Sequence, residues 1–238
     1  MSPNTNSEPV SANLLAYLEQ NVSGFRGPAR IQKFAGGQSN PTFKVSAASG
    51  NYVLRRQPPG KLLKSAHAVD REYRVQSALQ GSKVPVAKMY ALCEDPGELG
   101  TMFYIMDHCD GRIFWKAALP EIEEPQERAA IYDEMNRVLA ELHQVDLEKR
   151  GLQDYGKPGN YFARQLTRWP GKYGASELKP IPAMEEVMSC LDTNQPADDG
   201  KVALVHGDYR LDNMVFLHDK PEIIASLDWE LSTLVHPY

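Results

Sequence analysis

The sequence places its β-like and helical patterns in two successive parts, and this order restricts the folds open to it. Turn signals such as Ser49-Gly50-Asn51 separate short β-like runs, and one helical stretch lies among them between Ser65 and Gly81. The runs span residues 30–34, 42–47, 52–56, 88–92 and 101–107. We therefore expect a twisted antiparallel sheet with one helix.

The second part begins with a long helical pattern at Pro125. Its apolar stripe comprises Ile131, Met135, Val138, Leu139, Leu142 and Val145. After a stretch rich in Gly, Pro and Tyr (151–182) and a short helical segment come three brief β-like runs at 202–205, 213–217 and 222–227. The pattern predicts an α+β chain with two lobes, 1–108 and 109–238, and chemistry in the cleft between them.

The octapeptide HGDYRLDN is the sharpest motif of the chain. It sets His206, Asp208 and Asn213 in the spacing H-x-D-x-x-x-x-N, and Asp228 follows the next β-like run. This arrangement resembles the catalytic loop and the second metal-binding aspartate of kinases. A simpler reading is a β-turn in which Asp208, Asp212 and Asn213 hydrogen-bond to the backbone.

The kinase resemblance gives each of these residues a role. Asp208 would orient an acceptor hydroxyl and take its proton, while Asn213 and Asp228 would offer hard oxygen ligands to magnesium. His206 would hold the loop by hydrogen bonds. Arg210 would stabilise charge on the transferring phosphate. These residue types suit phosphoryl transfer, in which the protein mainly positions groups and stabilises charge.

Two segments of the first part resemble a nucleotide site. In FAGGQSNPTF, Gly36 and Gly37 would allow close backbone approach to phosphate, and Ser39 and Asn40 would donate hydrogen bonds to it. A Gly-Gly hairpin between two strands is the alternative.

The strand pattern YVLR places Arg55 where kinases carry the lysine that pairs with the ATP phosphates. Glu72, in the following helix, would orient Arg55. Arginine keeps the charge of lysine but has a different shape, and both residues could instead be ordinary solvated charges.

Taken together, the motifs resemble the aminoglycoside and choline phosphotransferase family, and within it the kinase-like domain that some proteins carry ahead of an acyl-CoA dehydrogenase module. The matching phrases are FAGGQSNPTF, YVLRRQPPG, DREYRVQ, HGDYRLDN and LDWELSTLVHP. The resemblance implies a protein-kinase-like bilobal fold with ATP and Mg²⁺ as cofactors. It also implies adenine binding by the backbone of Met106, Asp107 and His108, and phosphorylation of a small-molecule hydroxyl on an aminoglycoside, choline or a hydroxyacyl thioester.

Family members continue past the residues that match His236-Pro237, so we expect an incomplete second lobe at Tyr238. Apolar faces exposed in that lobe would favour dimerisation or lower stability. One alternative function is therefore a non-catalytic nucleotide-binding or interaction module. Another is a metal-dependent phosphoester hydrolase using His206, Asp208 and His143.

Composition limits the partners and the compartment. The formal net charge of -5, with scattered Lys and Arg, offers no basic field for nucleic acid. Cys93, Cys109 and Cys190 are far apart, as expected of free thiols in a reducing compartment. No apolar run approaches the roughly 20 residues that span a bilayer, and the start is no targeting peptide. We expect a cytoplasmic protein with no membrane partner.

Overall fold

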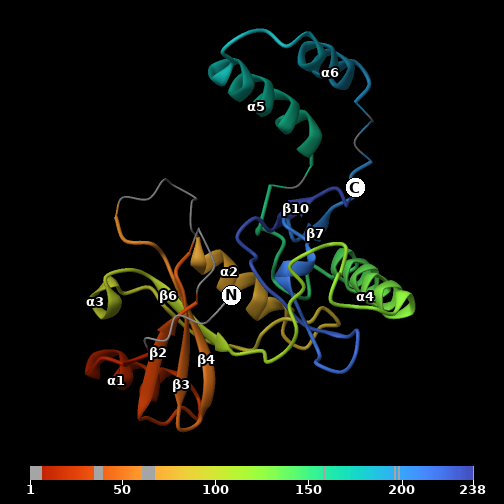
Figure 1. Ribbon diagram of the computed structural model, residues 1–238. Helices are drawn as coiled ribbons and strands as arrows, with labels where there is room; N and C mark the ends of the chain where they lie inside the picture. Colours follow the sequence, from red (N-terminus) through yellow and green to blue (C-terminus); the bar gives the residue numbers. More distant parts are fainter. Residues whose placement is uncertain are drawn as a thin grey trace. The chain divides into compact units, whose positions relative to one another are not determined.

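The computed structural model describes residues 7–34, 40–60, 68–157, 159–195, 197 and 199–237 (Figure 1). The chain forms two compact units. The first comprises Met1–Leu142 and His206–Ser232, and the second comprises His143–Val205 and Thr233–Tyr238. The division into lobes at residue 108 stays a prediction.

The first unit contains a six-stranded antiparallel sheet in the order β1-β2-β3-β4-β6-β5. Its strands are β1 (Glu8–Pro9), β2 (Ala29–Lys33), β3 (Thr42–Ala47), β4 (Gly50–Arg56), β5 (Met89–Cys93) and β6 (Phe103–Asp107). The five predicted runs all contribute strands, and the short β1 extends the sheet beyond them.

The two faces of this sheet carry different helices. Side chains alternate between the two faces of a strand. Tyr52 and Leu54 of β4 lie on the face that packs with helix α1 (Ala12–Asn21). The short helix α3 (Pro96–Leu99) also contacts α1. Val53 packs on the opposite face with Val69 of helix α2 (Val69–Leu79). Arg55, two residues after Val53, therefore also faces α2.

Helix α4 (Pro125–His143) follows the sheet in the chain, and its residues up to Leu142 lie in the first unit. Four residues of the predicted stripe are buried: Ile131, Met135, Val138 and Leu142. The first unit also holds the 3-10 turn η1 (Leu211–Asn213) and the hairpin of β8 (Met214–Phe216) and β9 (Ile223–Ser226).

Backbone hydrogen bonds tie this hairpin to segments that flank the large sheet. The Ser226 N–H donates to the Pro85 carbonyl at 2.9 Å. On the other strand, Arg112 and Phe216 exchange N–H···O bonds at 2.7 and 2.8 Å. The turn that leads from β9 to Asp228 is thereby fixed to the sheet that carries Arg55.

The second unit contains helices α5 (Tyr161–Ser176) and α6 (Pro182–Thr193), with strands β7 (Ala203–Val205) and β10 (Thr233–Val235) paired antiparallel. The three late β-like runs therefore do not form one cluster, because β7 pairs with β10 rather than with the β8–β9 hairpin. Helix α5 was also not indicated by composition, since it contains Pro170. Across the described chain, no helix combines the length and apolarity needed to cross a membrane.

Candidate functional site

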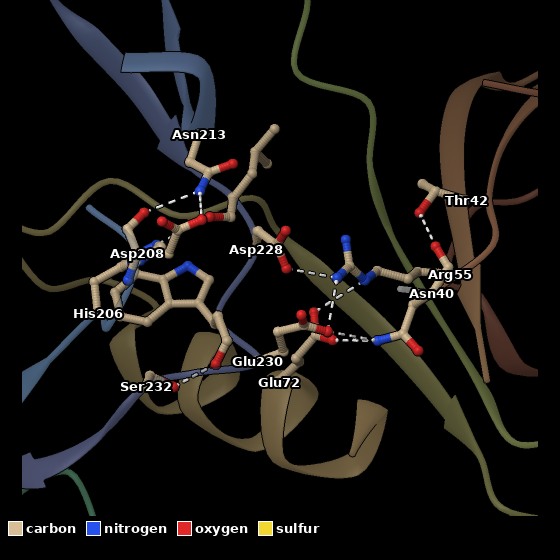
Figure 2. Close-up of polar contacts among 12 residues, drawn as sticks. Asn40, Thr42, Arg55, Glu72, His206, Asp208, Asn213, Asp228, Glu230 and Ser232 are labelled. Carbon is tan, nitrogen blue, oxygen red and sulfur yellow. Dashed lines mark hydrogen bonds and ion pairs between the residues drawn. The ribbon is translucent and has the colours of Figure 1, made fainter. Parts of the chain in front are cut away.

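Arg55 is held between two elements by its guanidinium group (Figure 2). Its Nε lies 3.1 Å from Glu72 Oε2 of α2, and its Nη2 donates to Asp228 Oδ1 at 2.6 Å. Glu230 Oε2 is 3.8 Å from the same Nη2. Only 12% of the Arg55 side chain is exposed, so these contacts are weakly screened by solvent.

Glu72 receives donors at both carboxylate oxygens. The Tyr104 hydroxyl donates to Oε2 at 3.0 Å, and the Asn40 amide donates to Oε1 at 3.0 Å. Burial raises the pKa of Glu72 to about 7, against the opposing effects of the Arg55 charge and the Tyr104 hydrogen bond. The carboxyl group is therefore buried, and donors from two elements fix its orientation.

Asn40 is 1% exposed, and its amide points at carboxylates. Besides Glu72, the Nδ2 group donates to Glu230 Oε2 at 3.3 Å. An amide nitrogen has two N–H donors, and both meet carboxylates here. The role of Asn40 as a phosphate donor stays a prediction, and in this structure its amide is directed at two carboxylates. The other residues predicted for this loop, Gly36, Gly37 and Ser39, lie outside the described residues.

The HGDYRLDN loop is tied to the Asp228 turn through one residue, Leu227. The Leu227 carbonyl is 2.9 Å from His206 Nε2, and the Leu227 N–H donates to the Asn213 carbonyl at 2.8 Å. The Asp208 N–H donates to His206 Nδ1, so Nε2 carries the proton that reaches Leu227. Burial lowers the pKa of His206, which favours this neutral form.

Asp208 and Asn213 contact each other within the loop. The Asn213 Nδ2 group donates to Asp208 Oδ2 at 3.0 Å and to the Asp208 carbonyl at 2.9 Å. Arg210 Nε lies 3.3 Å from Asp208 Oδ1, and Arg210 Nη2 donates to Asp212 at 2.7 Å. Because Asn213 donates through nitrogen, its amide oxygen is directed away from Asp208 and could face a cation.

Asp228 occupies a strained turn. Its φ of 62° lies in the left-handed region, which non-glycine residues seldom adopt. The neighbouring Trp229 is fully buried, and its indole N–H donates to the Ser226 carbonyl at 2.9 Å. The Trp229 ring also lies 4.5 Å from the His206 ring, centroid to centroid. The packing of Trp229 against His206 and the Trp229 hydrogen bond to Ser226 therefore both hold the turn.

Gly207 satisfies a steric requirement of the loop. Its φ is 84°, and a Cβ atom there would lie 2.4 Å from the Leu231 carbonyl oxygen. Only glycine fits both the backbone conformation and this close approach. The glycine of HGDYRLDN therefore lets the loop pass against the chain that follows Asp228.

Comparison with known proteins identifies the family. Residues 30–238 match the phosphotransferase enzyme family, APH. The chain belongs to this family. It is 46% identical to acyl-CoA dehydrogenase family member 10 of Mus musculus over 89% of its length, and 44% identical to family member 11 of Rattus norvegicus over 94%. It spans only 20% and 29% of those two proteins.

Solved structures agree with this assignment and confirm the predicted fold class. A Ralstonia eutropha structure assigned to an aminoglycoside phosphotransferase is 50% identical, with a TM-score of 0.87, and the match covers 97% of this chain and 67% of that one. Aminoglycoside phosphotransferase APH(4)-Ia, solved with AMP-PNP and hygromycin B, is 17% identical with a TM-score of 0.63, over 95% of this chain and 74% of that one. The second match supports the fold alone.

Against this family background, the predicted adenine contacts lie at the end of β6. The Asp107 N–H donates to the Lys88 carbonyl at 2.8 Å, and the His108 N–H donates to the Asn51 carbonyl at 3.4 Å. The long second bond is the weaker one and the easier to exchange for a ligand. Adenine binding by Met106, Asp107 and His108 remains a prediction.

Sequence patterns missed Tyr104 and Glu230. Tyr104 lies in an apolar strand, and that pattern predicts only a core residue. Its hydroxyl contact with Glu72 depends on the packing of α2, which the pattern does not show. Glu230 stands two residues after Asp228, and this D-x-E spacing was the available signal. The ligand oxygens of Glu72, Asp228 and Glu230 all lie within 4.8 Å of one another.

Proposed function

We propose that the chain is an ATP- and magnesium-dependent phosphotransferase that acts on the hydroxyl group of a small molecule. The γ-phosphoryl group of ATP is transferred to the hydroxyl oxygen, the hydroxyl proton passes to the Asp208 carboxylate, and ADP leaves. Arg210 is assigned to charge stabilisation near the transferred group. Family membership supports the phosphotransferase chemistry.

The observation that carries this proposal is the double hydrogen bond of Leu227. Leu227, the residue that precedes Asp228, is bonded through its carbonyl to the beginning of the HGDYRLDN loop, at His206, and through its N–H to the end of the loop, at Asn213. A β-turn that merely caps its own backbone has no need of this link. The link holds a candidate base and two candidate metal ligands in one rigid group, as phosphoryl transfer requires.

The donor set suits magnesium. Asp228 and Asn213 offer carboxylate and amide oxygens, which are the hard ligands that Mg²⁺ prefers. Glu72 and Glu230 add negative charge next to Asp228, and Arg55 alone compensates it among the described ion pairs of this cluster. A bound magnesium ion would supply charge neutralisation for the ATP phosphates.

The Arg55 guanidinium suits the nucleotide phosphates. Its Nε and Nη2 atoms meet carboxylates, whereas its Nη1 atom has no partner among the described residues. A planar guanidinium can bind carboxylate along one edge and phosphate with its remaining donors. The complex of APH(4)-Ia with AMP-PNP supports an ATP-type nucleotide for this fold.

The relatives and the fold neighbours support a ranking of the possible acceptors. Fold neighbours are solved with hygromycin B and with streptomycin, both small molecules. The relatives with 44–46% identity are named as acyl-CoA dehydrogenase family members, and this chain covers a minor part of them. We therefore rank a hydroxyacyl thioester first, followed by choline-like and aminoglycoside-like alcohols.

Calorimetric titration with Mg²⁺-ATP tests the nucleotide site, followed by ATP-dependent phosphorylation of the three acceptor classes. Wild type should bind Mg²⁺-ATP, and Asp228→Ala should lose the magnesium-dependent part of the affinity. Asp219→Ala, in the exposed turn between β8 and β9, is the matched control and should bind like wild type. Absence of binding to wild type at millimolar ATP would overturn the proposal.

A further inference from the structure

We propose that Tyr104 and Asn40 are positioning residues that set the orientation of Arg55 by acting through Glu72. The inference rests on the proposed function, because it assigns Arg55 to the phosphates of ATP. Each of the two side chains donates to one oxygen of the Glu72 carboxylate, at 3.0 Å in both cases.

Burial makes this arrangement more than an incidental contact. Tyr104, Asn40 and Glu72 are each 1% exposed or less. Water therefore cannot replace either donor, and a carboxylate without them would be left partly unsatisfied. The two donors arrive from separate elements, β6 and the segment before β3, so the carboxylate plane is held from two directions.

Sheet register explains why Tyr104 reaches this carboxylate. Tyr104 of β6 is the cross-strand partner of Arg55 of β4, so both side chains leave the same face of the sheet. Glu72 lies opposite them on α2, and its Oε2 atom receives the Tyr104 hydroxyl and pairs with Arg55 Nε at 3.1 Å. A rotation of the Glu72 carboxylate would move the Arg55 anchor.

The orientation of Asn40 follows from charge. Its Nδ2 group faces Glu72 Oε1 and Glu230 Oε2 at 3.0 and 3.3 Å. The flipped amide would direct its oxygen at two carboxylates, which is unfavourable. The neutral Asn40 amide therefore donates to two like-charged carboxylates at once, and so connects Glu72 with Glu230.

The need for such positioning arises from the second anchor of Arg55. Asp228 now binds Arg55 Nη2, but it is also assigned to magnesium in the proposed function. When Asp228 turns to the metal, Glu72 remains the close anchor of the guanidinium. The direction of the Glu72 carboxylate then determines where Arg55 presents its free donors to phosphate.

The test compares Tyr104→Phe with Tyr73→Phe by calorimetric titration with Mg²⁺-ATP and, separately, with adenosine. Tyr104→Phe keeps the buried ring and removes the hydroxyl group, which donates to Glu72 and also interacts with Gln76. Tyr73 is the matched control, because its ring lies 6.3 Å from the Tyr104 ring and packs in the same cluster. Asn40→Ala is the second variant.

We expect Tyr104→Phe and Asn40→Ala to weaken Mg²⁺-ATP about tenfold, the factor that about 1.4 kcal/mol represents, and to leave adenosine affinity unchanged. Adenosine lacks the phosphates that Arg55 would bind, so a merely structural role would change both ligands equally. An equal loss for both ligands, or no loss for either, overturns the inference while the proposed function stands. A wild type that binds no Mg²⁺-ATP overturns both.

Discussion

The HGDYRLDN loop and the Arg55 cluster carry the candidate chemistry in different ways. In the loop, 35% of the Asp208 side chain and 60% of the Arg210 side chain are exposed, and hydrogen bonds to the backbone of Leu227 hold the loop in place. In the cluster, Arg55 is 12% exposed and Glu72 is fully buried, and side chains hold one another.

Because of this contrast, substitutions in the loop and in the cluster should affect activity and stability differently. Removing a partly exposed loop carboxylate changes reactivity but leaves few buried groups without partners. Removing Glu72 takes one of two close carboxylates from the buried Arg55 and leaves the buried Tyr104 hydroxyl without its acceptor, so stability and ligand binding fall together. The following variants test this contrast in order of expected effect.

Asp208→Asn should reduce turnover by about 10² to 10⁴, because the amide cannot accept the hydroxyl proton. Unfolding free energy should change by less than about 0.5 kcal/mol, since the Asp208 side chain is partly exposed and asparagine can still accept from Asn213. Steady-state kinetics with the identified acceptor and urea unfolding measure the two effects. Asp212→Asn, in the same loop, is the control, and equal turnover loss in both variants would contradict the role of Asp208.

Glu72→Ala should lower the unfolding free energy by about 3 to 5 kcal/mol, the range for breaking a buried ion pair. Glu141→Ala breaks the pair with Lys83, whose side chain is 78% exposed, and should cost less than about 1 kcal/mol. Urea unfolding of both variants measures the contrast. Similar losses for the two variants would mean that burial does not distinguish these pairs.

Stability should also depend on pH through Glu72. Its folded pKa, raised to about 7, lies above the unfolded value of 4.5, so the folded state binds more protons between these pH values. The unfolding free energy should therefore fall as pH rises from 4.5 to 7, by about 1 to 3 kcal/mol, and level off above pH 7.

Denaturant unfolding from pH 4.5 to 8, compared with Glu72→Gln, isolates this effect. The variant lacks the titrating carboxyl group, so its unfolding free energy does not contain this slope. The unfolding free energy of wild type minus that of the variant should therefore fall as pH rises from 4.5 to 7. His206 has a lowered pKa and contributes the opposite slope in both proteins, so it cancels in the comparison. Parallel curves would show that Glu72 does not titrate in this range.

Gly207→Ala should lower the unfolding free energy by about 1 to 3 kcal/mol through the clash with the Leu231 carbonyl and the positive φ. Gly81→Ala shares a positive φ of 68° but meets no atom within 4 Å, so it reports the backbone strain alone. Thermal and urea unfolding should show the larger loss at position 207. A larger loss at position 81 would contradict the steric argument.

Arg210→Ala should have the smallest effect on stability, less than about 0.5 kcal/mol, because the Arg210 side chain that pairs with Asp208 and Asp212 is 60% exposed. Its turnover should fall less than that of Asp208→Asn. Urea unfolding and steady-state kinetics measure both quantities. A stability loss as large as that of Glu72→Ala would erase the distinction between loop and cluster.

Much of the first unit could be predicted from local patterns. Alternating runs indicated the strands of the large sheet, and the apolar stripe of 131–142 indicated α4. The spacing of HGDYRLDN and the later Asp228 indicated the family that the comparisons identify. Prediction was weaker for 151–182, where Pro170 and nearby glycines concealed α5, and for β7, whose partner β10 lies beyond the β8–β9 hairpin.

Periodicity and motif spacing are local properties, so the amino-acid sequence was enough to show which residue types are available for chemistry and which elements carry them. The contact of Asn40 with Glu230, 190 residues away, and the hydrogen bond from Tyr104 to Glu72 depend on the packing of distant elements. A buried polar group takes whichever partner the packing of distant elements brings within reach, and no local pattern encodes that choice.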